Sequence, residues 1–244
     1  MYMSLVQSLH FPPSGFGFWY YLGQYSQIQN IEYNECIGAS SGALLCLCTL
    51  LDEDKKEDIF EFTKSLAKNT LVEYRNQTKF INLHFISNHF ITQLFNHINW
   101  ENVNISKIKI ITTKVSFKYW VIPILSKVET VPETKEHLRE LTLATTYIPF
   151  ISNYNYKPYY TIHNEYFVDG GIIDFYTPSS YFSANYSKFS LSIPSVDMIY
   201  DLYIDGQTSP LTVHMVPSNS EFYLIHPFTF TLLLVLFLSI VHKR

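Results

Sequence analysis

Segments with strand-like and helix-like patterns of apolar residues alternate along the first three quarters of the chain. Short apolar runs bounded by polar residues, glycine or proline predict strands, whereas apolar residues three or four positions apart predict helices. Such an alternation predicts a layered α/β fold. Strands are predicted at 4–11, 34–37, 108–117, 120–128 (as hairpin partner or neighbour of 108–117) and 166–168, and helices at 16–28, 41–51, 56–68, 88–98 and 134–146.

The end of the chain departs from this pattern. Residues 222–241 are almost wholly apolar, and 229–240 has no polar face, which argues against a helix on the surface of a domain. The apolar stretch has about the ~20 residues that cross a bilayer. We therefore predict a folded domain at 1–206, a linker at 207–221 and a C-terminal hydrophobic helix that anchors the chain in a membrane. The alternative is a buried last helix of the domain.

Composition narrows the class of protein. Hydrophobic residues make up 47% of the 244 residues and aromatic residues 17%, which is enough for a sizeable core and excludes a disordered chain. The formal net charge is -4, and no basic patch stands out, so nucleic acid is not expected as a partner. The richness in Asn, Ile, Lys and Tyr is compatible with the AT-rich genome of a large virus or a protist.

Cysteine usage indicates a reducing compartment. Cys36, Cys46 and Cys48 lie in one apolar stretch, their number is odd, and no secretory signal precedes them. We expect reduced, buried thiols and a cytosolic domain. No histidine lies close enough in sequence to complete a recognisable metal-ligand spacing, so no metal site is predicted.

The few glycines of the chain mark a candidate catalytic turn. Gly38-Ala39-Ser40-Ser41-Gly42 matches the G-x-S-x-G pattern, between a predicted strand and a predicted apolar helix. In this motif the nucleophile occupies a sharp, strained strand-to-helix turn, and tiny residues on either side let strand and helix pass close together. Ser40 is therefore the candidate nucleophile. The alternative is a glycine-flanked turn without chemistry, and Ser41 lacks the flanking symmetry.

Asp169 lies in the segment Asp169-Gly170-Gly171, which follows a predicted strand. Ser40, Asp169 and His214 have the order of a Ser-Asp-His triad. However, fewer than forty residues precede Ser40, which is too few for the strands that come before the nucleophile in the α/β-hydrolase fold. A Ser-Asp dyad suits the sequence better, although Asp-Gly-Gly is also a common turn sequence.

Three segments in this order resemble the patatin-like phospholipase family: Phe11 to Tyr20, Gly38 to Gly42, and Val168 to Gly171. The resemblance implies a three-layer α/β/α sandwich with a central, mostly parallel sheet in the domain at 1–206. It also implies a lipid acyl hydrolase in which Asp169 takes the proton of Ser40 directly. The expected partners are then a lipid substrate and a membrane, and no cofactor is implied.

The loop after the first strand departs from the family. In the family, this loop is a run of glycines followed by a basic residue. The backbone N–H groups of the loop form the oxyanion hole. Here Pro13, Ser14 and Gly15 occupy the corresponding positions, with Gly17 in place of the basic residue. Proline has no N–H group, so we expect the donors to be Ser14, Gly15 and Phe16. The alternative function is therefore a catalytically weak or inactive, membrane-tethered lipid-binding protein.

Overall fold

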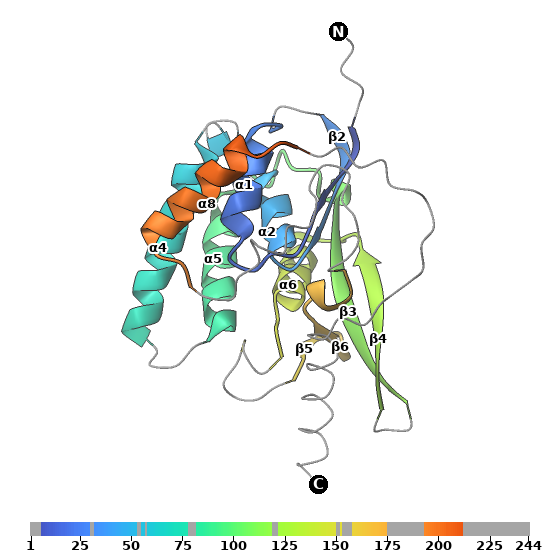
Figure 1. The fold of residues 1–244 in the computed structure, drawn as a ribbon. Helices are drawn as coiled ribbons and strands as arrows, with labels where there is room; N and C mark the ends of the chain where they lie inside the picture. Colours follow the sequence, from blue (N-terminus) through green and yellow to red (C-terminus); the bar gives the residue numbers. More distant parts are fainter. Residues whose placement is uncertain are drawn as a thin grey trace.

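The structure is a computed structural model, which describes residues 6–29, 32–52, 55–56, 58–77, 82–118, 122–149, 152, 158–174 and 193–211. These residues form an α/β fold around one six-stranded sheet (Figure 1). The predicted hydrophobic helix at 222–241, and the linker beyond residue 211, lie outside the described residues. Within them, no helix is long and apolar enough to cross a membrane.

The sheet is mixed, with four strands in one direction and two in the other. Strands β1, β2 and β3 are parallel neighbours, whereas β4 and β6 pair antiparallel with β3, and β5 pairs antiparallel with β6. The strands are β1 (Val6–Phe11), β2 (Tyr33–Ala39), β3 (Ile108–Lys118), β4 (Ile122–Thr130), β5 (Tyr160–Ile162) and β6 (Glu165–Val168).

Strand β3 organises the sheet because it pairs with three other strands. Its partner β4 occupies one edge from Ile110 to Lys118. A strand has only two edges, so β2 and β6 must share the other one. Strand β2 runs along it up to the pair Ala39–Ile111, and β6 runs from the opposite direction down to the pair Val168–Thr113. The two strands therefore end almost head to head, separated by a single residue of β3.

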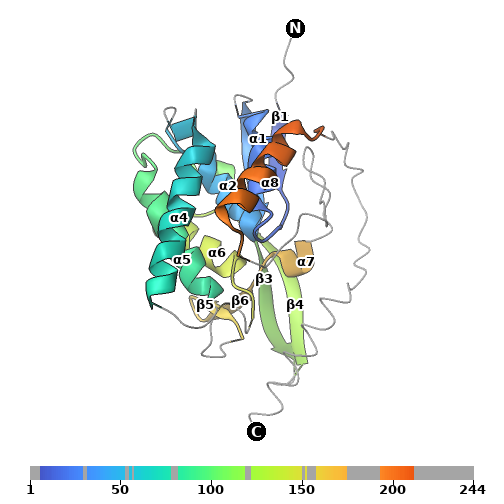
Figure 2. The same ribbon diagram turned by 60° about the vertical axis from the view of Figure 1, so that its left-hand side comes forward.

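Helices α2, α6, α5 and α4 cover one face of this sheet in two tiers (Figures 1 and 2). Helix α2 packs on β1 and β2, and α6 packs on β3, while α5 covers α2 and α6, and α4 lies against α5. The helices are α1 (Phe18–Ser26), α2 (Ser41–Cys48), α4 (Ile59–Gln77), α5 (Leu83–His97), α6 (Lys135–Thr145), α7 (Gly171–Asp174) and α8 (Val196–Thr208), with a 3-10 turn η1 at Ile105–Lys107.

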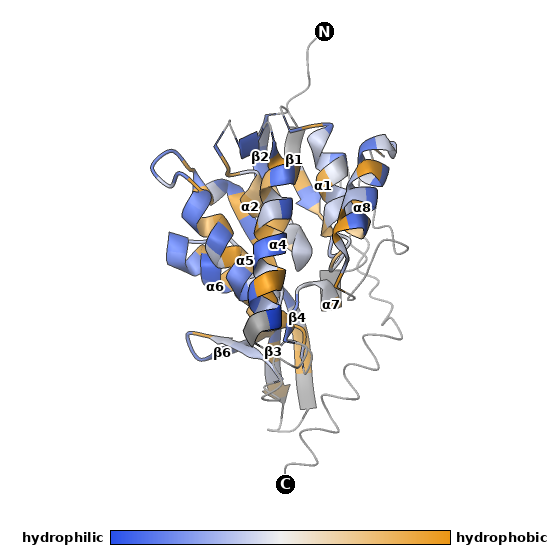
Figure 3. Cartoon of the chain, turned by 90° about the vertical axis from the view of Figure 1, so that its left-hand side faces the viewer, coloured by the Kyte–Doolittle hydropathy of each residue, from blue (hydrophilic) through white to orange (hydrophobic). Residues whose placement is uncertain are grey.

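The core lies between the sheet and these helices. Helix α2 is coloured as hydrophobic over most of its length in Figure 3, as expected for a helix enclosed on all sides, whereas α4 carries both hydrophobic and hydrophilic residues. Cys36, Cys46 and Cys48 are free and fully buried in this core. Burial raises the pKa of the Cys46 and Cys48 thiols, which keeps them protonated and unreactive.

Helix α8 docks on α1 through two glycines, in a segment for which no helix was predicted. A Cβ atom at Gly206 would lie 1.9 Å from the Tyr20 carbonyl oxygen, and one at Gly23 would lie 2.1 Å from that of Tyr203. The backbones therefore approach as closely as only glycine allows. Gln27 closes the contact by donating to the carbonyls of Gly206 and Ser209, so the chain stays packed on α1 just past residue 206.

Most predicted elements are present, with shifted ends. Helix α5 begins at Leu83 rather than at residue 88 because the Asn82 side chain caps it by accepting from the Phe85 N–H. The segment predicted at 120–128 is the antiparallel hairpin partner of β3, at Ile122–Thr130. Strand β5 was not predicted. It is joined to β6 by a two-residue turn in which both His163 and Asn164 have positive φ.

Candidate active site

Ser40 lies at a strained turn between β2 and α2. Its φ of 54° and ψ of -126° fall in a region that a non-glycine residue rarely adopts. The flanking glycines are required by close packing: a Cβ atom at Gly42 would lie 2.2 Å from the Phe11 carbonyl oxygen, and one at Gly38 would lie 2.5 Å from that of Gly42. The turn therefore has the geometry of a nucleophile elbow.

Asp169 meets Ser40 because β2 and β6 end almost head to head along β3. The Ser40 hydroxyl donates a hydrogen bond of 2.7 Å to Asp169 Oδ2. The other carboxyl oxygen, Oδ1, accepts a bond of 2.7 Å from the Gly171 N–H. Both carboxyl oxygens thus have a fixed partner, and Oδ2 points at the Ser40 hydroxyl.

The environment of Asp169 suits a base that works near neutral pH. The side chain is buried, and burial raises its pKa to about 7, although the hydrogen bonds from Ser40 and Gly171 act to lower it. An ordinary aspartate has a pKa of about 3.9. A carboxyl group with a pKa near the working pH is able both to accept and to return a proton.

A threonine at the end of α6 connects the two halves of the site. Thr145 Oγ1 accepts the Ser40 backbone N–H at 2.8 Å and donates to the Ile111 carbonyl at 2.5 Å. The Thr145 carbonyl accepts the Gly170 N–H at 3.2 Å. A Cβ atom at Gly170 would lie 2.1 Å from the Ile111 carbonyl oxygen. Only glycine therefore fits where the Asp169 turn crosses β3.

The turn that carries Asp169 has two further backbone anchors. The Asp169 N–H donates to the Tyr147 carbonyl at 2.8 Å, and the Asp169 carbonyl accepts the hydroxyl of Thr113 at 2.9 Å. It also accepts the Ile172 N–H at 3.1 Å. These bonds come from the segment just after α6, from β3 and from the start of α7, so the position of Asp169 depends on three separate segments.

The loop after β1 is locked onto the elbow. Ser41 Oγ accepts the Ser14 N–H at 2.9 Å, and the two hydroxyl oxygens lie 2.8 Å apart. Both residues are buried. Pro13 fills the space beside the Asp169 turn, because a Cβ atom at Gly171 would lie 2.7 Å from Pro13 Cβ. The Ser14 N–H, predicted as an oxyanion donor, is therefore already engaged by Ser41.

Three backbone N–H groups beside Ser40 remain as candidate oxyanion donors. Gly15, with φ of 57°, and Phe16 line the pocket next to Ser40. Ser41 is the first residue of α2 and also lines the pocket, so its N–H belongs to the unpaired first turn of a helix. Between described residues the Phe16 and Ser41 N–H groups have no acceptor, whereas Gly15 takes part in a β-bridge.

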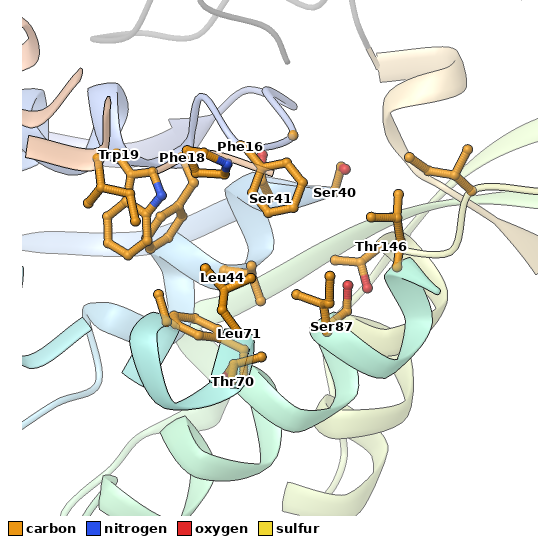
Figure 4. A pocket seen from close by; sticks show the side chains of 18 of the residues that line it. Phe16, Phe18, Trp19, Ser40, Ser41, Leu44, Thr70, Leu71, Ser87 and Thr146 are labelled. Carbon is orange, nitrogen blue, oxygen red and sulfur yellow. The ribbon is translucent and has the colours of Figure 1, made fainter. Parts of the chain in front are cut away.

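A mostly apolar pocket opens beside Ser40 (Figure 4). Its cavity volume is about 110 Å³. The lining comes from the loop after β1, from α1, α2, α4, α5 and α8, and from the segments around Thr146 and Asp169. Such a lining favours an apolar ligand with a polar group held at Ser40.

Among the residues that the structure describes, no histidine contributes to this pocket. His163 is exposed in the turn between β5 and β6, and His214 lies outside the described residues. No histidine is among the described residues that line the pocket. No group of three or more His, Cys, Asp or Glu side chains in those residues could hold a metal ion.

The sequence did not single out Thr145, Thr113 or the Ser41 N–H. Thr145 is one of several threonines near the end of a helix, and nothing in its local pattern indicates a contact with a turn 105 positions earlier. The Ser41 N–H could have been found, because the residue after the nucleophile of an elbow commonly donates to the oxyanion.

Comparison with known proteins does not assign the chain to a family. The chain matches no protein-family model and no curated protein at a significant level.

Proposed function

We propose that the chain is a serine acyl hydrolase of the patatin-like type, in which Ser40 is the nucleophile and Asp169 is the base. The observation that carries the proposal is the 2.7 Å hydrogen bond from the Ser40 hydroxyl to Asp169 Oδ2. It joins a strained elbow to a buried carboxyl group whose pKa is raised to about 7. A nucleophile within hydrogen-bond reach of a fixed base is the arrangement that covalent acyl transfer requires.

The reaction then takes two steps. Ser40 Oγ attacks the carbonyl carbon of an ester while its proton passes to Asp169 Oδ2, and the carbonyl oxygen becomes an oxyanion. When the oxyanion collapses, the bond to the alcohol breaks, and the protonated Asp169 returns its proton to the leaving oxygen. Water attacks the acyl-enzyme in the same way, with Asp169 again as base, and releases the carboxylic acid and free Ser40.

The oxyanion needs donors at about 3 Å. We assign this role to the N–H groups of Gly15, Phe16 and Ser41, and not to that of Ser14, which Ser41 Oγ already engages. The Ser14–Ser41 pair instead holds the loop against the elbow. The N-terminal end of α2, directly after Ser40, adds the positive end of a helix dipole.

The apolar pocket favours an acyl ester over a polar substrate, which supports a lipid hydrolase. We further propose that residues 222–241 anchor the chain in a membrane with the domain in the cytosol, because that stretch has about the length and apolarity of a span. Deleting residues 222–244 should move the protein from the membrane fraction to the soluble fraction. Extraction of the full-length protein by carbonate alone would contradict a spanning anchor.

A second candidate is a lipid-binding protein that keeps the pocket without turnover. The specific observation in its favour is the loop after β1, where Pro13 has no N–H and the Ser14 N–H is engaged. Losing one oxyanion donor costs on the order of 10² to 10³ in rate. With two donors fewer than a glycine run offers, Ser40 would keep its base but lack stabilisation of the oxyanion.

Labelling with a fluorophosphonate probe tests the proposal. The probe forms a covalent bond with an activated serine, so wild type should be labelled and Ser40→Ala should not. Hydrolysis of short-chain esters and of a phospholipid, each compared with Ser40→Ala, then separates the two candidates. If wild type is neither labelled nor faster than Ser40→Ala on any ester, the hydrolase is wrong and the lipid-binding protein is favoured.

A further inference from the structure

The pocket extends from Ser40 toward a far end between α4 and α5. In Figure 4, Ser40 and Phe16 lie at one end, Leu44 lies in the middle, and Leu71 and Thr70 lie at the other end. Leu44 follows Ser40 by one turn of α2, so its side chain forms the wall next to the nucleophile. An acyl chain bound to Ser40 would therefore run past Leu44 toward Leu71.

Closely packed side chains line this far end. Helices α4 and α5 contact each other, and the residues that they contribute are mostly buried and apolar. Ala67 and Leu71 lie one turn apart on α4 and therefore share a face. The residues that α4 and α5 contribute to the lining are Ala67, Thr70, Leu71, Leu83, Ile86, Ser87 and Phe90.

The volume of the pocket limits the length of chain that it holds. Its cavity volume of about 110 Å³ is smaller than the ~150 Å³ that accommodates a benzene ring. In proportion to that six-carbon ring, the pocket holds about four carbon atoms of a chain. We infer that this site takes a short acyl chain, of about four to six carbons, which makes short-chain esters its substrate class if the proposed hydrolase function holds.

This inference predicts a break in the dependence of affinity on chain length. Each methylene that leaves water contributes ~0.8 kcal/mol, which is about a fourfold gain in affinity. The gain should stop once the pocket is full, because further methylenes remain in water. Side chains at the far end should set the position of the break, so a smaller residue moves it to longer chains and a larger residue moves it to shorter chains.

The binding experiment uses full-length Ser40→Ala and a series of n-alkanols from propanol to decanol, each below its aggregation limit. Trp19 lines the pocket, so its fluorescence reports binding, and Trp19→Phe shows which part of the signal comes from it. Leu71→Ala enlarges the far end, and Ala67→Leu fills it. Leu66→Ala is the matched control, because Leu66 is buried on the same helix but does not line the pocket.

A second arm measures wild-type hydrolysis of p-nitrophenyl esters from acetate to laurate. We expect affinity to rise about fourfold per methylene up to about pentanol or hexanol and then level off. The break should move to longer alkanols in Leu71→Ala, to shorter ones in Ala67→Leu, and stay in place in Leu66→Ala. Ester turnover should be fastest with butanoate or hexanoate.

Two results would overturn the inference. One is an affinity that keeps rising fourfold per methylene through decanol. The other is a break that does not move in Leu71→Ala or Ala67→Leu while both variants keep the circular dichroism spectrum of the parent. If the alkanol break appears but no ester is hydrolysed faster than by Ser40→Ala, the short-chain pocket is supported and the hydrolase function is wrong.

Discussion

The turn at Ser40 and the turn at Asp169 reach the same point of β3 from opposite directions, but they are held there differently. The Ser40 turn is shaped mainly by its own segment, through Gly38, Gly42 and the start of α2. The backbone of Ser40 has one bond to a distant part of the chain, from its N–H to Thr145, while the hydroxyl groups of Ser40 and Ser41 bond to Asp169 and Ser14.

The Asp169 turn depends far more on distant residues. Its backbone N–H is bonded to Tyr147, its carbonyl accepts from Thr113, and Gly170 is bonded to Thr145. Burial rather than a neighbouring charge raises the pKa of its carboxyl group. The nucleophile is thus positioned locally, whereas the base acquires both its position and its acidity from the assembled fold.

The largest expected effect follows from removing either member of the pair. Ser40→Ala removes the nucleophile, and Asp169→Asn keeps the shape of the base but not its ability to accept a proton. We expect each change to lower kcat/KM by about 10³-fold or more. Because the two groups act as a unit, the double variant should be little worse than either single one. Ester hydrolysis by the purified proteins measures this.

A matched control for these variants is Ser65→Ala, at an exposed position of α4. It should leave both activity and stability unchanged. Full activity in Asp169→Asn would mean that another group acts as the base for Ser40. The way in which the Asp169 turn is held would then have no bearing on catalysis.

The next effect is on pH dependence, where activity and stability should move in opposite directions. Hydrolysis needs the carboxylate form of Asp169, so kcat/KM should rise about tenfold per pH unit below about 7 and then level off. The folded-state pKa of Asp169 is raised above its unfolded value. Its contribution to stability is therefore complete below about pH 4 and is lost as pH rises through about 7.

Asp169→Asn tests this contrast, since an amide does not titrate. The variant should be more stable than wild type at pH 8 by at least about 1 kcal/mol, and the difference should shrink at pH 5. Urea denaturation at the two pH values measures it. A wild type that gains stability relative to Asp169→Asn as pH rises would show that Asp169 is ionised at low pH and that its burial is compensated.

Thr145→Val should have an intermediate effect, because it breaks the bond that joins the two turns. The Ser40 N–H loses its acceptor, and an unsatisfied buried donor costs about 1 to 3 kcal/mol. A displaced nucleophile should lower kcat/KM by about 10- to 100-fold with a small change in KM. Thr145→Ser keeps the hydroxyl and should retain most of the activity.

Thr112→Val is the matched control for Thr145→Val. Thr112 is fully buried, but its hydroxyl has no hydrogen-bond partner among the described residues. Replacing it by a methyl group should therefore be neutral or slightly stabilising. Equal losses in Thr112→Val and Thr145→Val would mean that the bond to Ser40 is unimportant and that only packing at this depth matters.

The same contrast explains what the sequence could predict. The elbow is encoded by neighbouring residues, so the strand before Ser40, the apolar helix after it and the glycine spacing were visible as a local pattern. The α/β fold class followed from the alternation of strands and helices. Helix α8 could have been identified from Asp197, Asp201 and Asp205, which recur every fourth residue, but its docking through Gly206 depends on α1.

The surroundings of Asp169 could not be predicted for a different reason. Strand β6 was predicted at 166–168, but β5 is three residues long, which is too short for a period-2 pattern to stand out. Their place on β3 depends on which edge β4 leaves open, which is a property of the whole sheet. The engaged Ser14 N–H likewise depends on Ser41, 27 positions away, so the oxyanion loop could be located but not described.

Thr113→Val should have the smallest effect and completes the comparison. Thr113 donates to the Asp169 carbonyl, but that carbonyl also accepts the Ile172 N–H at 3.1 Å and so keeps a partner after the change. Valine has nearly the shape of threonine and suits a central strand. We expect the free energy of unfolding to fall by about 1 kcal/mol at most and kcat/KM to change less than about threefold. Measured beside Thr145→Val, a much larger loss in Thr113→Val would show that the Asp169 turn depends on this single bond and that its remaining anchors do not hold it.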